Sequence, residues 1–231
     1  MNKVIGLIGA MDEEISLLLE GMLDKVTFTK CGIQYHKGSF AGKSVVVCKS
    51  GVGKVNAAVT TQILIDTFKA EEVLFTGVAG ALHPELNIGD IVISSECMQH
   101  DMDVTPLGFP RGIIPYQEVS SFPADANLIT LAEQACREQK VHHLTGKVLS
   151  GDQFIANRET VIMLSEQLEG VCAEMEGAAV AQVCYMNHIP FVIIRSMSDK
   201  ADGSAYVNFR EFTVEASKRS HAILEHMIPF L

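Results

Sequence analysis

Residues 190–202 read PFVIIRSMSDKAD, a continuous apolar run that starts at Pro190 and ends in polar residues, with Asp199 just past its carboxyl end. An apolar run of this length, bounded by Pro and by Ser and Asp, is typical of a strand buried on both faces of a parallel sheet. Parallel sheets bind ligands outside the carboxyl ends of their strands. We therefore expect Asp199 to lie where the chemistry of this protein takes place.

Three other strand-like segments are followed by acidic or aromatic residues. AEME at 173–176 opens a helix-like run over 177–187, MDEE at 11–14 follows the first predicted strand, and SGDQF at 150–154 follows another. The acids at 11–14 either favour the amino end of a helix through its dipole, or one of them faces a pocket as a base. Phe154 is either a core residue or a surface on which a planar ring stacks. Together, the four strand ends predict one shared site.

The composition indicates a single α/β domain over residues 1–231. With 48% hydrophobic and 20% charged residues, the chain is long enough for one sizeable core and needs no second one. The formal charge of -10, without clustered Lys and Arg, argues against nucleic acid or an anionic membrane as a partner. Six cysteines without a CxxC pair, and no apolar segment as long as a secretion signal or membrane span, favour a reduced, cytoplasmic protein.

Short β-branched runs alternate with longer amphipathic ones, which predicts a three-layer α/β fold with a mixed central sheet flanked by helices. Strands are expected at 3–8, 44–48, 72–76, 91–95, 142–149, 171–174 and from 190, and helices over 12–23, 55–68, 125–139, 158–167, 177–187 and 209–226. Residues 30–40 are expected to pair antiparallel with 44–48. Between 97 and 123 the periodicity fails, and loops of this kind are usually functional or interfacial.

Two glycine motifs and one polar motif have alternative interpretations. GVGK at 51–54 joins a strand to a helix but lacks the full phosphate-loop pattern, so a tight turn is favoured over a nucleotide triphosphate site. GVAG at 77–80 lacks the third glycine of a dinucleotide fingerprint, although its backbone can touch a small ligand. HDMD at 100–103 offers metal-ligand atoms, but no other His or Cys has matching spacing. We therefore predict no metal.

Five motifs carry a resemblance to a known family. GAMDEE at 9–14, SGVGKVNAA at 50–58, SGDQFI at 150–155, EMEGAAVAQVC at 174–184 and RSMSDKAD at 195–202 together resemble 5'-methylthioadenosine/S-adenosylhomocysteine nucleosidases, within the purine nucleoside phosphorylase superfamily. The resemblance covers nearly the whole chain in the right order. It implies a nucleoside phosphorylase-like fold with a partly barrel-like mixed sheet, a homodimer, and no cofactor.

The resemblance also implies a role for each site residue. Asp199 is the general acid that protonates adenine N7, Glu14 activates the attacking water, and Glu176 holds the ribose hydroxyls. The other substrate-binding residues of this subunit are Met11, Val52, Val78, Ala79, Gly80, Phe154, Ile155, Glu174, Met175, Ser198 and Phe209. The partner subunit is expected to contribute Val104, Leu107, Phe109 and Pro115. Val78 stands where the family often has Ser, and Leu107 where relatives have an aromatic residue.

The chemistry of adenine release supports these roles independently. Adenine is a poor leaving group as an anion, so breaking its bond to ribose needs an acid and a base on opposite sides of that bond. Asp199 must therefore hold a proton near neutral pH, which predicts that it is buried with a raised pKa. The acids at 12–14 repel phosphate, which favours water as the nucleophile. A nucleoside phosphorylase and a catalytically silent nucleoside-binding homologue are the alternatives.

Overall fold

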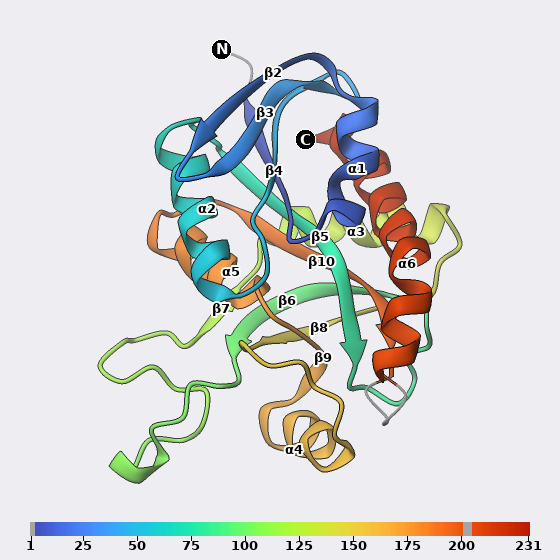
Figure 1. Ribbon diagram of the computed structural model, residues 1–231. Coiled ribbons are helices and arrows are strands. Elements are labelled where there is room, and N and C mark those ends of the chain that lie inside the picture. The colour runs from blue at the N-terminus through green and yellow to red at the C-terminus, as the bar shows by residue number, and fades with distance from the viewer. Residues whose placement is uncertain (1–2, 201–204) are drawn as a thin grey trace.

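The computed structural model describes residues 3–200 and 205–231, and the side chains of its last helix from Phe212 onward (Figure 1). The strands are β1 (Val4–Gly9), β2 (Leu23–Lys30), β3 (Ile33–Phe40), β4 (Lys43–Lys49), β5 (Glu72–Ala81), β6 (Ile91–Gln99), β7 (Ser121–Pro123), β8 (His143–Ser150), β9 (Gly170–Glu174) and β10 (Phe191–Asp199). The helices are α1 (Asp12–Gly21), α2 (Lys54–Asp66), α3 (Ala126–Glu138), α4 (Arg158–Leu168), α5 (Gly177–Met186) and α6 (Ala205–Met227), with 3-10 turns η1 (Thr105–Leu107) and η2 (Ile228–Phe230).

The strands form one mixed sheet in the order β10-β6-β8-β9-β5-β1-β4-β3-β2, with β7 paired to β6. A further pairing of β10 with β5 closes five of these strands, β5, β10, β6, β8 and β9, into a ring. β1, β5 and β10 run parallel to one another, whereas β10 meets β6, and β5 meets β9, in antiparallel pairs. The predicted α/β fold with a mixed, partly barrel-like sheet is confirmed.

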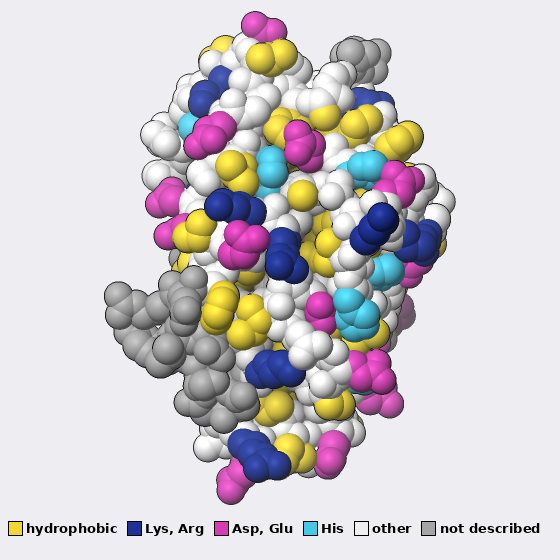
Figure 2. All heavy atoms as spheres, turned by 90° about the vertical axis from the view of Figure 1, so that its right-hand side faces the viewer, with side chains coloured by type: hydrophobic (Ala, Val, Ile, Leu, Met, Phe, Trp, Pro, Cys, Tyr) yellow, Lys and Arg dark blue, Asp and Glu magenta, His cyan; other side chains and the backbone are white. Residues whose placement is uncertain are grey.

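Helices cover both faces of the sheet, α1, α3 and α6 on one side and α2 and α5 on the other (Figure 1). Successive side chains of β1 point to opposite faces of the sheet, as the two-residue period of a strand requires. Ile5 and Leu7 pack in the cluster that includes α3 and α6, and Ile8 packs in the cluster that includes α2 and α5. On the described part of the face that carries α6, acidic and basic side chains are interspersed (Figure 2).

Three predicted boundaries were wrong. The helix expected over 12–23 ends at Gly21, and Leu23–Lys30 forms the unpredicted edge strand β2. Every residue of β2 is exposed, so no alternation of buried and exposed positions marks it in the sequence. β5 continues through GVAG at 77–80, because this segment pairs with β10 instead of leaving the sheet. The last helix begins at Ala205 and not at 209.

Two predicted features of the chain are confirmed. Residues 33–40 pair antiparallel with β4 through a turn at 41–42. The segment between β6 and β7 is irregular except for η1, and it projects from the body of the molecule (Figure 1). Within the described residues, no helix combines the length and hydrophobicity needed to cross a membrane.

Candidate active site

The predicted strand ends meet at one cavity. It is lined by Ala10, Met11, Glu14, Val52, Val78, Ala79, Gly80, Gln153, Phe154, Ile155, Ala173, Glu174, Met175, Glu176, Ser198 and Asp199. Every residue predicted for this subunit's site and described with its side chain therefore lies at the cavity. Sequence reasoning missed Ala10, Gln153 and Ala173, which are sequence neighbours of predicted residues. Phe209 lies outside the residues whose side chains are described.

The convergence has a different geometric cause from the one expected. Parallel strands bring their carboxyl ends to one edge, and this holds for β1, β5 and β10. β9 runs antiparallel to β5, but the pairing of Gly80 with Ala173 brings its end alongside the last residues of β5. The ring of strands therefore places Glu174 and Glu176 next to the ends of β5 and β10, which a flat parallel sheet would not do.

Glu14 points into the protein from the first turn of α1 and is only 4% exposed. Its Oε2 accepts hydrogen bonds from the amides of Ala10 at 2.6 Å and Met11 at 3.0 Å, and its Oε1 accepts one from the amide of Val78 at 3.0 Å. Burial raises the pKa of Glu14, against the lowering effect of Arg195 and these amides. Asp12, two residues earlier, points to solvent and pairs with Lys49 at 2.8 Å. The acidic run at 12–14 thus combines one buried carboxylate with surface charge.

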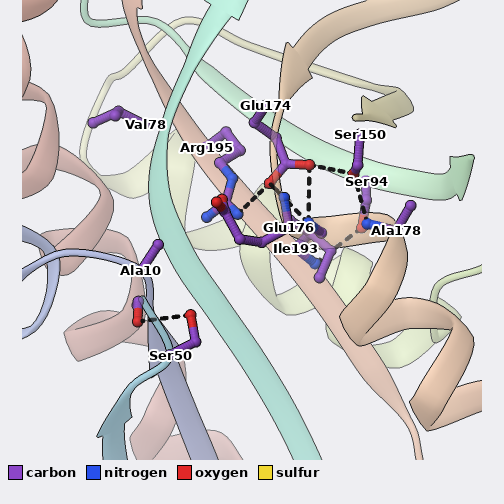
Figure 3. A network of polar contacts seen from close by, with 12 residues as sticks. Ala10, Ser50, Val78, Ser94, Ser150, Glu174, Glu176, Ala178, Ile193 and Arg195 are labelled. Carbon is purple, nitrogen blue, oxygen red and sulfur yellow. Dashed lines mark hydrogen bonds and ion pairs between the residues drawn. The ribbon is translucent and has the colours of Figure 1, made fainter. Parts of the chain in front are cut away.

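The carboxylate oxygens of Glu174 accept hydrogen bonds from several other residues of the protein (Figure 3). It accepts hydrogen bonds from Arg195 Nη2 at 2.5 Å, from the Ser150 hydroxyl, and from the amide of Gly177 at 2.8 and 2.9 Å. A carboxylate with this many donors is fixed in place. Although Glu174 lines the cavity, its oxygens serve mainly to hold Arg195 and the start of α5.

Glu176 has a different environment from Glu174. Its Oε1 accepts one hydrogen bond, from the amide of Gly53 at 2.8 Å. Burial, followed by the negative charge of Glu174, raises the pKa of Glu176 to about 8. Glu176 is therefore a carboxyl group that changes its charge near neutral pH at the wall of the cavity.

Arg195 is a buried residue beside these acids that sequence reasoning did not single out. It is 1% exposed, its Cζ lies 3.9 Å from the centroid of the Phe75 ring, and its Nη1 and Nε have no hydrogen-bond partner among the described residues. A methyl group at Gly77 would overlap both Glu14 Oε1 and Arg195 Nη1, so glycine lets these two groups approach each other. The available signal was an arginine inside the apolar run 190–197, because a buried cation requires carboxylate partners.

Asp199 lies at the end of β10 and is 2% exposed, so its predicted burial is confirmed. The Ser198 hydroxyl donates a hydrogen bond to Asp199 Oδ1 at 2.8 Å. The raised pKa that we predicted for Asp199 stays a prediction. Across the cavity, Phe154 is 48% exposed, so this ring is a cavity wall and not a core residue.

The four residues assigned to the partner subunit do not line the cavity of their own subunit. Val104, Leu107, Phe109 and Pro115 lie on the projecting segment, which we call the arm (residues 104–115). Leu107 is 72% exposed, and the ring of Phe109 contacts that of Tyr116 at 5.9 Å. The arm is therefore an extension from the body of the molecule that carries exposed apolar side chains and does not line its own cavity.

The two remaining motifs have structural roles. GVGK at 51–54 forms a tight turn, with Gly51 and Gly53 at φ of 80° and 99°, values that favour glycine. Asp101 and Asp103 of the HDMD segment pair with Lys54 and Arg111, both at 2.6 Å. Among the described residues, no group of three His, Cys, Asp or Glu side chains forms a metal site.

Comparisons with known proteins agree with this fold and site. The model of the Phosphorylase superfamily matches residues 4–229. The 5'-methylthioadenosine/S-adenosylhomocysteine nucleosidase of Staphylococcus carnosus is 41% identical over 231 residues, covering 99% of this chain and 100% of the relative. The solved structure of the Neisseria meningitidis nucleosidase of the same name, in complex with methylthio-immucillin-A, has a TM-score of 0.95 and 38% identity, covering 99% of this chain and 100% of the other. A futalosine hydrolase of Helicobacter pylori has a TM-score of 0.96 and 35% identity, covering 100% of this chain and 99% of the other.

The ring of strands and its carboxylate-lined cavity define an enzyme of the phosphorylase superfamily that acts on N-glycosidic bonds. Within that superfamily, the chain belongs to the family of 5'-methylthioadenosine/S-adenosylhomocysteine nucleosidases.

Proposed function

We propose that this enzyme hydrolyses the N-glycosidic bond of 5'-methylthioadenosine and S-adenosylhomocysteine. The products are adenine and either 5-methylthioribose or S-ribosylhomocysteine. The observation that carries the proposal is the set of buried carboxyl groups, Glu14, Glu176 and Asp199, that face one cavity beside the buried Arg195. Acid, base and sugar-binding groups are the parts that breaking a glycosidic bond requires.

Asp199 acts as the general acid. It donates its proton to adenine N7, the bond between N9 and C1' breaks, and its electron pair leaves with the neutral base. Positive charge then develops on the ribose in an oxocarbenium-like transition state. A positioned general acid typically contributes 10² to 10⁴-fold. The burial of Asp199 favours the protonated carboxyl, and the Ser198 hydroxyl fixes its orientation.

Glu14 acts as the general base on the attacking water. Its raised pKa brings the carboxylate closer to the pH at which it must accept a proton. Three amide donors fix both of its oxygens, so the carboxylate does not rotate away from the cavity. The water attacks C1', Glu14 takes its proton, and Arg195 Nη1 offers a hydrogen bond to the same region.

Glu176 holds the ribose hydroxyls and Met175 packs on the sugar. In its ionised form, which becomes dominant above its pKa of about 8, Glu176 also stabilises the positive charge of the transition state. Phe154 stacks on adenine, the backbone of Ile155 reads its edge, and Met11 and Val52 line the pocket of the 5' substituent. The arm of the second subunit of a cytoplasmic homodimer closes this pocket with Val104, Leu107, Phe109 and Pro115.

Water is favoured over phosphate as the nucleophile by the charge of the site. A phosphorylase must bind a dianion, which requires cationic groups without competing carboxylates. Here Arg195 already neutralises Glu174, and the charges of Glu14 and Glu176 lie close enough to act on it. A dianion would therefore meet carboxyl groups, and no Lys or Arg side chain lies among the described residues that line the cavity.

One assay tests the proposal against its alternatives. The protein is mixed with methylthioadenosine, S-adenosylhomocysteine, adenosine, inosine and futalosine, with and without phosphate, while free base and reducing sugar are followed. We expect adenine from the two thio-nucleosides without phosphate. Release that requires phosphate would identify a phosphorylase, and thermal stabilisation by methylthioadenosine without release of base would identify a silent binding protein. If futalosine were the only one of these substrates to release its base, the protein would instead be a futalosine hydrolase, like the Helicobacter pylori protein of that name.

A further inference from the structure

Lys54 occupies a position that its own helix does not favour. It is the first residue of α2, where the helix dipole disfavours a cation, and no acidic residue lies in that first turn. The lysine is mostly buried, and its Nζ lies 2.6 Å from Asp101 Oδ1 and 2.9 Å from Gln99 Oε1. The placement of this cation therefore reflects its contacts with other segments and not the stability of α2.

Lys54, Asp101 and Asp152 form a closed ring of three hydrogen bonds. The Lys54 ammonium donates to Asp101 Oδ1 at 2.6 Å, the Asp152 amide donates to Asp101 Oδ2 at 3.0 Å, and the Lys54 amide donates to Asp152 Oδ1 at 2.8 Å. Although burial pushes the pKa of Asp101 upward, the hydrogen bonds from Lys54 and Asp152 hold it below its ordinary value. Asp101 is therefore the charged centre of the ring.

This hydrogen-bonded ring of Lys54, Asp101 and Asp152 joins two walls of the cavity that come from different parts of the chain. On one side, Gly53 precedes Lys54 and donates its amide to Glu176. On the other side, Asp152 begins the irregular segment that carries Phe154 and Ile155, which we call the base wall (residues 152–155). Gly151 packs against the buried His100 so closely that a methyl group there would lie 2.5 Å from two atoms of its ring. The base wall is thus tethered at its start to α2 and to the segment after β6.

We propose that Lys54 and Asp101 are positioning residues, which fix the base wall relative to Glu176 so that the base and the sugar of one nucleoside are held together. For its kinetic consequence this inference rests on the proposed function. The base wall binds substrate, whereas Glu14 and Asp199 carry out the chemistry from other elements. Breaking the hydrogen bonds among Lys54, Asp101 and Asp152 should therefore weaken substrate binding more than it slows the chemical step.

The test compares Lys54→Met and Lys54→Arg with the wild-type protein. We expect Lys54→Met to raise KM for methylthioadenosine about tenfold while kcat changes less than threefold, and Lys54→Arg to restore most of the loss. Lys49→Met is the matched control, because Lys49 forms an exposed ion pair with Asp12 and neither residue lines the cavity. An unchanged KM in Lys54→Met, or equal losses in Lys49→Met and Lys54→Met, would overturn the proposal.

A second measurement does not depend on turnover. Amide hydrogen exchange over residues 151–157 should be at least tenfold faster in Lys54→Met, and in Asp101→Asn, than in wild type, with β1 and β5 unchanged. Asp101→Asn keeps one acceptor oxygen for the Asp152 amide but removes the charge and replaces the oxygen that accepts from Lys54 by an NH2 donor. It therefore breaks the Lys54–Asp101 pair from the other side and applies if Lys54→Met fails to fold. Equal exchange in wild type and Asp101→Asn would rule out the tether. A wild-type protein that releases no adenine would instead refute the proposed function and leave the exchange result to decide the tether.

Discussion

The two sides of the cavity are built in opposite ways. The side with Glu14, Glu174 and Arg195 is buried, and its carboxylates accept several hydrogen bonds each from fixed backbone and side-chain donors. The opposite side, the base wall, presents the exposed ring of Phe154 on irregular backbone. Charges need a preorganised, water-poor environment to act on a transition state, whereas a planar base needs only a surface to stack on. Under the proposed function, the chemistry and the recognition of the substrate would therefore fall on different sides of the cavity.

Removing the central cation should have the largest effect. We expect Arg195→Met to leave Glu174 buried without its counter-charge, which costs about 3 to 5 kcal/mol of unfolding free energy. For a chain of this size, that cost lowers Tm by about 6 to 20 °C. Thermal unfolding measures it, with Arg137→Met as the control, because the Arg137–Glu133 pair is exposed on α3 and is worth about 0 to 1 kcal/mol. Equal Tm values for the two variants would show that the buried side is not held together by this charge.

Substitution of the two carboxyl groups that we propose to be catalytic should have the next largest effect. We expect Asp199→Asn and Glu14→Gln each to lower kcat at least about a hundredfold, close to 2.7 kcal/mol of transition-state stabilisation. Asp12→Asn is a matched control for Glu14→Gln, because Asp12 lies in the same acidic run but points to solvent. Steady-state kinetics with methylthioadenosine measure all three. Near-normal turnover in either catalytic variant would remove that residue from the mechanism.

Glu176 should connect the stability of the protein to pH. Its folded pKa of about 8 lies above the ordinary value of 4.5, so the folded chain keeps a proton that the unfolded chain loses within that window. The free energy of unfolding therefore falls as pH rises from about 4.5 to 8. We expect Glu176→Gln to be less sensitive to pH over this range, by about 1 kcal/mol or more, which is about 2 to 4 °C in Tm. Parallel Tm curves for the two proteins from pH 5 to 8 would contradict this assignment.

The sequence indicated where the site lies, but it did not reveal how the charges on the buried side of the cavity are paired. The apolar run ending at Asp199 and the acids at 11–14 indicated the site, because strand ends in α/β sheets carry ligands. The family resemblance supplied the roles of Phe154 and Glu176, which no periodicity reveals. The sequence did not reveal that Glu174 and Arg195 neutralise each other, because that pairing depends on β9 turning back onto β5 in the ring of strands. Long-range pairing of this kind leaves no local signal.

The smallest effect should come from the exposed side, and it distinguishes stacking from general packing. We expect Phe154→Ala to raise KM for methylthioadenosine about three- to tenfold, since an aromatic stacking contact is worth about 0.5 to 1.5 kcal/mol, with little change in kcat or Tm. Ile162→Ala on α4 is the matched control, because Ile162 is 45% exposed, close to the 48% of Phe154, but does not line the cavity. If Phe154→Ala lowered kcat as strongly as Asp199→Asn, the base wall would take part in the chemistry. The separation between a catalytic side and a recognition side would then be wrong.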